Sequence, residues 1–258
     1  MADARVHVER AHGVARCTLE RPPLNLLEPG LIASLRETFE TLAGDASIRV
    51  AVLTGAGRAF TAGMDVHVLR DLDVASARGL ISSLCAAIDA VHRAPFPVIA
   101  AVNGACLGAG FELALACDLR IAATGAVFGL PEVRVGVPSV IQAALLPPLI
   151  GPGRAAEMLL LGASVTAPQA LEWGLVNRVV APGELSAAVD EVLDVLARCG
   201  PAAVRLQKEL IVRWRETSLP SAVQAGVNAF ALAYATGEPR EGAEAFLAKR
   251  APRFGPDA

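Results

Sequence analysis

Hydrophobic and polar residues alternate near the start of the chain, over Val6–Glu9 and Val14–Leu19. An alternation with a period of two predicts half-buried β-strands, because successive side chains of a strand point to opposite faces. Three later runs are almost wholly apolar and end close to a glycine, which predicts buried strands that lead into loops. These runs are Val50–Thr54, Val98–Val102 and Leu119–Ala123.

Segments with a helical period of apolar residues lie between these strands, as in the segment that begins at Pro29 and in Ala77–Arg93. Strands that alternate with helices are typical of an α/β fold. From Leu185 onward the pattern is almost purely helical, over 185–199, 202–217, 222–235 and 241–249. We therefore predict an α/β body over residues 1–198 and a C-terminal helical region over residues 199–258, with the break near Gly200-Pro201.

Composition narrows the classes of function. Hydrophobic residues make up 53% of the 258 residues, which is ample for a core, and the net charge of −3 argues against a nucleic-acid binder. Residues 1–10 lack the apolar core of a signal peptide. The apolar stretch Val98–Cys117 contains Asn103, Glu112 and glycines, which makes it poor material for a membrane span. We expect a cytoplasmic protein with no membrane and no nucleic-acid partner.

Cysteine and histidine show no metal-site spacing. The five cysteines form no CxxC motif, and each lies in apolar sequence, which predicts buried, reduced thiols. The four histidines are scattered along the chain. We expect no metal and no separate cofactor.

Two glycine-rich loops are candidates for chemistry, Gly55-Ala-Gly57 and Gly108-Ala-Gly110. Both lack the third glycine of a dinucleotide fingerprint and its acidic partner, which argues against an NAD-binding enzyme. Each loop follows a buried strand and leads towards a helix, so free backbone N–H groups there are able to form an oxyanion hole. Ordinary tight turns are the alternative for either loop alone.

Two glutamates lie in apolar surroundings, Glu112 and Glu132. A buried carboxylate must be paired, solvated or protonated, and two neighbouring carboxyls titrate as a coupled pair. One alternative is that Glu112 is paired with an arginine such as Arg120 and that Glu132 is an ordinary loop acid. Together with the two glycine loops, however, the pair indicates acid/base chemistry on a carbonyl compound.

Several longer motifs resemble those of the crotonase (enoyl-CoA hydratase/isomerase) superfamily. Phe60–Val66 resembles its F-x-A-G-x-D motif, and Ala100–Asp118 its A-x-x-N-G-x-x-x-G-x-G-x-E-L-x-x-x-C-D segment. Phe128–Pro138 is similar to F-x-x-P-E-x-x-x-G-x-x-P, and Ala170–Val180 and Glu241–Arg250 complete the series. The matches follow the family's order over nearly the whole chain.

This resemblance implies a spiral of β-β-α turns followed by a helical tail used to form a homotrimer, often a dimer of trimers. It implies an enoyl-CoA hydratase of fatty-acid β-oxidation, whose substrate is an acyl-CoA thioester and which needs no cofactor beyond that substrate. The N–H groups of Met64 and Ala109 would form the oxyanion hole, and Glu112 and Glu132 would activate one water across the 2,3-double bond. The alternatives are another reaction of this fold, such as isomerisation or a specialised acyl-CoA (de)hydration, and a binding or scaffold protein without chemistry.

The resemblance also implies a set of substrate and CoA contacts. Phe246 and Lys249 would reach the adenine and phosphates of CoA bound to a neighbouring subunit, although Lys249 also fits a solvated cation at a helix end. The full set is Arg58, Ala62, Gly63, Asp65, Gly108, Pro131, Ser139, Phe246 and Lys249.

Two departures from the family pattern bear on the substrate. Hydratases commonly have P-G-A-G-G-T where this chain has Pro138-Ser-Val-Ile-Gln-Ala143, so bulkier residues should reshape the acyl end of the pocket. Short straight-chain enoyl-CoA is therefore not expected to be the best substrate. The loop Arg21–Asn25 is shorter than usual and lacks a lysine near the CoA phosphates, for which Arg21 or Arg58 is a candidate replacement.

Overall fold

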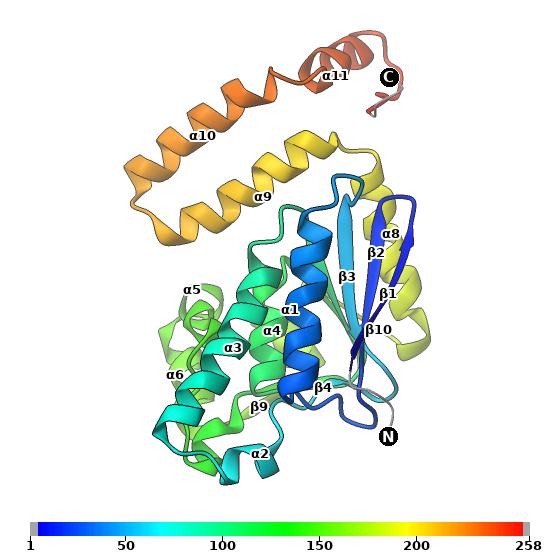
Figure 1. Ribbon diagram of the computed structural model, residues 1–258. Helices are drawn as coiled ribbons and strands as arrows, with labels where there is room; N and C mark the ends of the chain where they lie inside the picture. The colour runs from blue at the N-terminus through cyan, green and yellow to red at the C-terminus, as the bar shows by residue number, and fades with distance from the viewer. Residues whose placement is uncertain (1–4, 255–258) are drawn as a thin grey trace.

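A computed structural model describes residues 5–254, which form a large, mostly parallel sheet with helices on both faces (Figure 1). The six strands lie in the order β1-β2-β3-β5-β7-β10; β1 is antiparallel to β2, and the other pairs are parallel. Their bounds are β1 Arg5–Ala11, β2 Val14–Glu20, β3 Val50–Gly55, β5 Val98–Val102, β7 Leu119–Ala123 and β10 Arg178–Val180.

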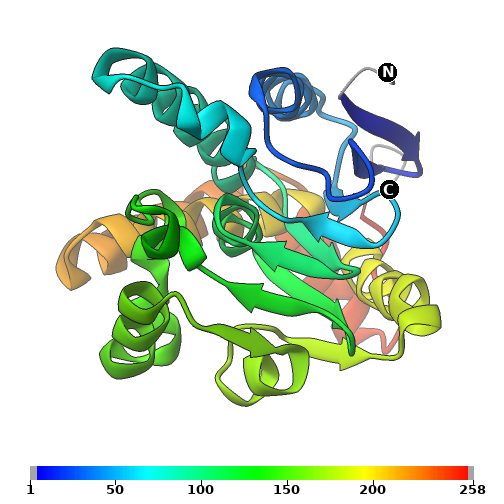
Figure 2. The same ribbon diagram turned by 90° about the horizontal axis from the view of Figure 1, so that it is seen from below.

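A second sheet of four short strands, β4-β6-β8-β9, lies at the carboxyl ends of the main strands (Figure 2). The strands are β4 Ala59–Thr61, β6 Ala105–Leu107, β8 Val127–Gly129 and β9 Ser164–Thr166. The long strands β3, β5 and β7 are each followed by one of these short strands and then by helical structure, so the predicted spiral of β-β-α turns is confirmed. The short strands themselves escaped prediction, because three residues are too few to show a period of two.

The strand period explains how the main sheet is covered. Ala51 and Leu53 of β3 point into the core beneath α1, α3 and α4, whereas Val50 and Val52 point to the other face and pack against α8. These helices are α1 Pro29–Ala43, α3 Val74–His92, α4 Ala109–Ala116 and α8 Leu185–Ala197. The shorter elements are α2 Val66–Arg70, η1 Pro131–Val135, η2 Gln142–Leu145, α5 Leu146–Ile150, α6 Pro152–Leu161, α7 Ala167–Glu172 and η3 Pro182–Glu184.

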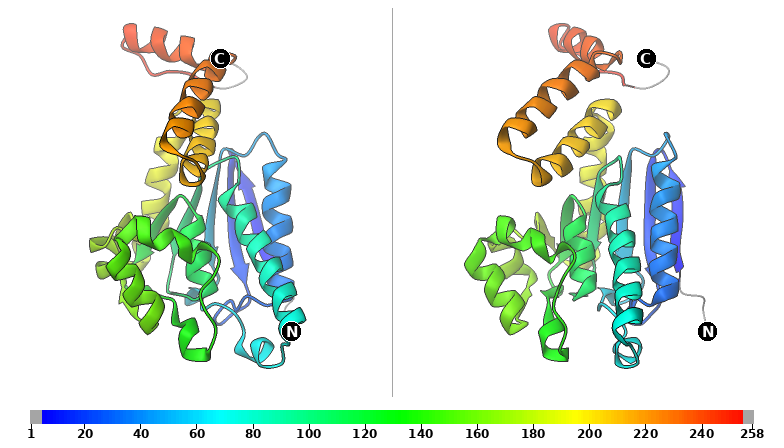
Figure 3. Two further views of the ribbon diagram at one scale, coloured as in Figure 1. Left: turned by 90° about the vertical axis from the view of Figure 1, so that its left-hand side faces the viewer. Right: turned by 60° about the vertical axis from the view of Figure 1, so that its left-hand side comes forward.

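Three helices form the C-terminal tail: α9 Pro201–Glu216, α10 Leu219–Ala233 and α11 Glu238–Leu247. α10 packs along α9, and α10 and α11 extend away from the sheets (Figures 1 and 3). The carboxylate of Glu238 accepts hydrogen bonds from the N–H groups of Ala202 and Ala203 at 2.8 and 2.9 Å, so α11 caps the start of α9. The division of the chain after residue 198 stays a prediction. The last four residues of the predicted C-terminal region, 255–258, lie outside the described residues.

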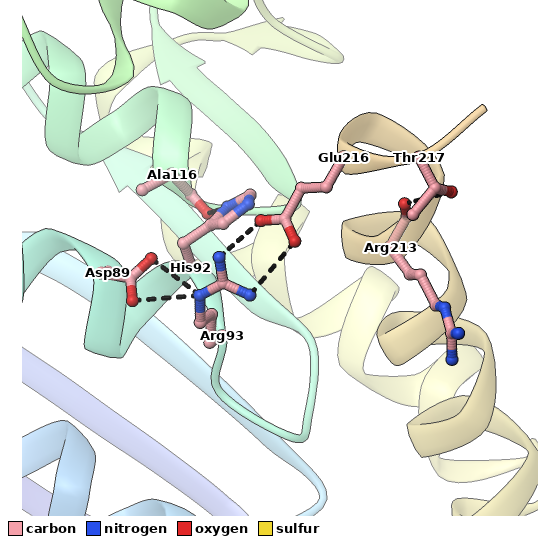
Figure 4. Close-up of polar contacts among 7 residues, drawn as sticks. All are labelled: Asp89, His92, Arg93, Ala116, Arg213, Glu216 and Thr217. Carbon is pink, nitrogen blue, oxygen red and sulfur yellow. Dashed lines mark hydrogen bonds and ion pairs between the residues drawn. The ribbon is translucent and has the colours of Figure 1, made fainter. Parts of the chain in front are cut away.

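Polar contacts anchor α9 to the α/β body. Lys208, only 3% exposed, donates to both oxygens of Asp118 at 2.7 and 2.8 Å, and Asp118 also accepts from the N–H of Val98. Farther along α9, Glu216 pairs with Arg93, which also binds Asp89 (Figure 4). A buried ion pair with additional hydrogen bonds fixes an orientation, and each partner becomes costly to remove alone.

Replacing Lys208 with methionine should therefore lower the free energy of unfolding by about 2–4 kcal/mol, because the Asp118 carboxylate, whose side chain is 14% exposed, is left largely desolvated without its cation. Urea unfolding followed by circular dichroism measures the loss. Arg36→Met, which removes a pair with Glu40 at the surface, is the matched control and should have little effect. A Lys208→Met protein as stable as the control would contradict this anchoring role.

The cysteines differ in burial, and one of them lies on the long apolar helix α3. Cys17, Cys106 and Cys117 are buried, but Cys85 is exposed on α3, so the prediction that every thiol is buried is wrong. Among the described residues α3 alone is long and apolar enough to cross a membrane, and it packs here against α1 and α4. The segment Val98–Cys117 forms β5, β6 and α4. The first four residues of the N-terminal stretch that lacks a signal-peptide core, 1–4, lie outside the described part of the chain.

Candidate active site

Two glycine-containing turns meet at the amino end of α4. Gly63 and Gly108 have φ angles of +91° and +55°, which side chains of L residues rarely adopt. A Cβ on Gly63 would lie 2.8 Å from the carbonyl oxygen of Leu107 and 3.5 Å from the amide nitrogen of Ala109. The backbones therefore approach each other more closely than side chains would allow.

The meeting point, here called the glycine junction (residues 62–64 and 108–109), supplies candidate N–H donors. Ala109 is the first residue of α4, and the first N–H groups of a helix have no partner within it. Met64 directly follows Gly63, and both Met64 and Ala109 line a common cavity. By contrast, Gly57 has no atom within 4 Å of its would-be Cβ and lies outside this cavity. The Gly55–Gly57 loop, the other glycine-rich candidate, therefore does not line this cavity.

Glu112 lies one turn into α4 with a side chain that is almost fully buried. Its Oε1 accepts from the N–H of Val140 at 3.0 Å, and its Oε2 accepts from Ile141 and Gln142 at 2.9 and 3.0 Å. Burial raises the pKa of Glu112 to about 6, although the three donors oppose the shift and the nearby charge of Glu132 adds to it.

Arg120, the alternative partner of Glu112, binds elsewhere. Its guanidinium donates to the carbonyl oxygens of Leu175, Ala114 and Cys117 at 2.6 to 3.3 Å. The pairing of Glu112 with this arginine is therefore wrong. The carboxylate is compensated by backbone dipoles instead of a cation.

Glu132 lies in the 3₁₀ helix η1 and faces the same cavity. Its Oε2 accepts from the hydroxyl of Ser139 at 2.8 Å, and its Oε1 lies 2.9 Å from the position that a Cβ on Gly108 would take. Burial raises the pKa of Glu132, and the hydrogen bond from Ser139 lowers it in part. Glu132 thus lies directly beside the glycine junction.

The cavity that these groups share has a volume of about 770 Å³. Glu112, Glu132 and the glycine junction form one end, whereas side chains of α2, α3 and the segment 135–141 line the rest. Most of these side chains are aliphatic: Val66, Leu69, Leu72, Leu80, Ile81, Leu84, Val135, Val137, Val140 and Ile141. Such a cavity suits a ligand with an apolar chain and a polar reacting end.

The structure brings together nine of the residues predicted to act in the site. Ala62, Gly63, Met64, Gly108, Ala109, Glu112, Pro131, Glu132 and Ser139 all line the cavity. The roles assigned to them stay predictions, but their common location is a structural fact.

Four predicted contact residues lie outside the cavity. Asp65 caps α2 by accepting from the N–H of His67 at 2.9 Å, and Arg58 is exposed. Phe246, 83% exposed, and Lys249 lie at the end of the tail. Arg21, a candidate for the CoA phosphates, pairs with Glu28.

The comparisons with known proteins agree along the whole chain. The sequence profile of the family described as enoyl-CoA hydratase/isomerase matches residues 9–257. The chain belongs to the enoyl-CoA hydratase/isomerase family. It is 38% identical to a putative enoyl-CoA hydratase/isomerase of Bacillus subtilis, with 97% of each chain covered. It is 35% identical to a crotonyl-CoA hydratase of Syntrophomonas wolfei, with 98% of this chain and 99% of that protein covered.

Solved structures of the family agree as well. The crystal structure of an enoyl-CoA hydratase from Bacillus anthracis matches with a TM-score of 0.92 at 36% identity and covers 97% of this chain and 98% of that one. An enoyl-CoA hydratase from Mycobacterium smegmatis matches with a TM-score of 0.93 at 35% identity, with 96% and 98% covered. The resemblance to the crotonase superfamily is confirmed.

Sequence reasoning missed the donors that hold Glu112. The N–H groups of Val140, Ile141 and Gln142 act through the backbone, so their residue types give no signal. It also missed the aliphatic wall contributed by α2 and α3, because apolar positions of a helix indicate burial without saying against what. Within residues 5–254 no three His, Cys, Asp or Glu side chains cluster as metal ligands.

The raised pKa of Glu112 predicts a pH dependence of stability. Because the folded state holds this proton more tightly than the unfolded chain does, the contribution of Glu112 is fully present below pH 4.5 and is lost as pH rises through about 6. The free energy of unfolding, measured relative to Glu112→Gln, should fall by about 2 kcal/mol over that interval. Chemical unfolding of both proteins between pH 4 and 7 tests this, with the exposed Glu157→Gln as control; parallel curves for wild type and Glu112→Gln would refute it.

Proposed function

We propose that the chain is an enoyl-CoA hydratase that adds water across the 2,3-double bond of a 2-enoyl-CoA thioester. The observation that supports this most strongly is that Glu112 and Glu132 line one cavity together with the glycine junction. Two carboxyls with raised pKa values next to backbone N–H donors suit a reaction that moves two protons around a polarised carbonyl group.

In this mechanism the thioester oxygen accepts hydrogen bonds from the N–H groups of Met64 and Ala109. The positive end of the α4 dipole at Ala109 stabilises the negative charge that develops on that oxygen. Polarisation makes C3 electrophilic, and a water held between Glu112 and Glu132 attacks it. One carboxylate takes the proton of this water, and the other carboxyl group donates a proton to C2.

The apolar cavity bears on the acyl group. The aliphatic wall formed by α2, α3 and segment 135–141 extends well beyond the two glutamates, and Val140 and Ile141 stand where the common family pattern has small residues. We propose that acyl chains longer than crotonyl are preferred. The proposed enzyme uses no cofactor besides the CoA of its substrate, for whose phosphates Arg21, Arg58 and Lys249 remain candidates.

The test is the loss of 2-enoyl-CoA absorbance on crotonyl-CoA and on a series of longer substrates. Rapid loss, with the highest kcat/KM beyond six carbons, is the expected result. The best rates on four- and six-carbon substrates would refute the proposed acyl preference, and no loss at any chain length would refute hydration. In that case a double-bond isomerase becomes the favoured activity, since the oxyanion donors would serve it equally.

We further propose a homotrimer or a dimer of trimers, assembled through the tail and acting in cytoplasmic β-oxidation. The support is a row of large exposed apolar residues on α10 and α11: Leu219, Val223, Val227, Phe230, Leu232, Phe246 and Leu247. Monomers rarely expose so many together. Three chains of 26.6 kDa would give a mass of about 80 kDa by light scattering, and six about 160 kDa. Phe230→Glu should shift this towards the monomer, whereas Val74→Glu on α3 should not; a monomeric wild type would refute the assembly.

A further inference from the structure

One short segment, Ser139–Gln142, contacts both glutamates of the cavity. The chain leaves η1 through Gly136, whose φ of +84° turns the backbone back over the cavity. Ser139 thereby reaches Glu132, seven positions earlier in the sequence, while the next three N–H groups reach Glu112. The positions of the two carboxyls thus depend on the same four residues.

The two glutamates are held in different ways. Glu112 has three backbone donors, which persist whatever side chains residues 140–142 carry. Among the described residues, Glu132 has a single side-chain donor, the hydroxyl of Ser139. The backbone N–H of Glu132 itself also interacts with this carboxylate, but a residue's own N–H sets no direction towards the rest of the cavity. A glutamate has three rotatable bonds, so the one donor from another side chain bears most on which way the group points.

The hydroxyl also decides which oxygen of Glu132 is available. Ser139 donates to Oε2, whereas Oε1 lies against Gly108, the residue before Ala109. The oxygen that faces the glycine junction is therefore Oε1, which does not accept the hydrogen bond from Ser139. The common family pattern has a glycine at position 139, which carries no hydroxyl. The hydrogen bond to Glu132 therefore depends on the serine of this chain.

We propose that Ser139 is a positioning residue, which acts through Glu132 by directing Oε1 towards the reacting end of the substrate. This inference rests on the proposed hydratase function and adds to it a residue that sets the geometry of one carboxyl. It differs from the role of a substrate contact, for which Ser139 is also a candidate.

The two roles predict different kinetics. Without the hydroxyl, Glu132 samples other rotamers, so Ser139→Ala should lower kcat about 10- to 100-fold with little change in KM. Loss of the hydrogen bond should also raise the pKa of Glu132 further, so the limb of the pH–kcat/KM profile that reports this group moves to higher pH. Ser139→Thr keeps the hydroxyl and should restore most of the rate.

The experiment measures kcat, KM and pH profiles of wild type, Ser139→Ala, Ser139→Thr, Glu132→Gln and the double variant Ser139→Ala/Glu132→Gln. Ser83→Ala, an exposed serine of α3 outside the site cavity, is the matched control. If Ser139 acts through Glu132, its removal costs little once Glu132 is glutamine. A rise in KM with kcat unchanged, or full additivity of the two losses, would overturn the proposal.

A measurement that does not depend on enzymatic activity can test the role of Ser139 separately from the proposed hydratase activity. Carbon-13 NMR of labelled glutamate follows the titration of Glu132, assigned through Glu132→Gln, in wild type and in Ser139→Ala. A higher pKa in Ser139→Ala supports the positioning contact even if no enoyl-CoA is hydrated, which would refute the hydratase alone. An unchanged titration would overturn the role of Ser139 even in an active hydratase.

Discussion

Replacing Glu112 with glutamine is expected to lower kcat for hydration of 2-enoyl-CoA by about 10²- to 10⁴-fold, the range for loss of a positioned acid or base. The amide cannot take up or release the proton. Its NH₂ group would also face at least one of the N–H groups of Val140, Ile141 and Gln142, which all donate to the carboxylate. Spectrophotometric assay of the purified variant at saturating substrate measures this.

Glu132→Gln should give a loss of the same order, since hydration needs both proton transfers. The exposed Glu157→Gln is the matched control and should retain full activity. If either Glu112→Gln or Glu132→Gln kept a third or more of the wild-type kcat, the paired-carboxylate mechanism would be refuted. A large loss in only one variant would favour isomerisation, which can proceed with one base.

Replacing Gly108 with alanine is expected to lower kcat about 100-fold and the free energy of unfolding by about 1–3 kcal/mol. The backbone of Gly108 has φ +55° and ψ −133°, and the new Cβ would lie 2.9 Å from Oε1 of Glu132. Both the N–H of Ala109 and the carboxyl of Glu132 must then shift. Steady-state kinetics and thermal unfolding on the same preparation give the two quantities.

Gly57→Ala is the control that separates two causes of loss at Gly108: the strain of a positive φ in an alanine, and the clash of the new Cβ with neighbouring atoms. Gly57 also has a positive φ, +72°, but nothing lies within 4 Å of its would-be Cβ. The control should therefore lose stability by a similar backbone cost and keep its kcat. Equal losses of kcat in both variants would show that the effect at Gly108 is general destabilisation and not displacement of the site.

The long strands and helices could be predicted because their hydrophobic periods are long enough to recognise. The α/β body, the helical tail, the start of α1 and the extent of β3 follow from such patterns. The short strands β4, β6, β8 and β9 could not, since each is three residues long and is fixed by pairing with distant segments. Tertiary contact, not local propensity, decides those elements.

The residues of the candidate site also fall into those that the sequence reveals and those that it does not. Glu112, Glu132 and Gly108 stand out because acids and glycines in apolar sequence need a reason, and their motifs resemble a known family. The alternative that Glu112 pairs with Arg120 is wrong, and the true donors are backbone N–H groups, which the residue types of a sequence do not reveal. The exposed position of Cys85 was missed for a related reason: its apolar neighbours Leu84, Ala87 and Ile88 form the buried face of α3, whereas Cys85 lies on the exposed face.

The backbone attachment of Glu112 bears on how the enzyme can diverge. Because N–H groups of residues 140–142 hold the carboxylate, the side chains of Val140 and Ile141, which line the same cavity, can be exchanged without removing a donor. Only proline, which lacks the N–H, would break the attachment. Substrate range can therefore evolve at these positions through single substitutions while the acid–base geometry is inherited unchanged.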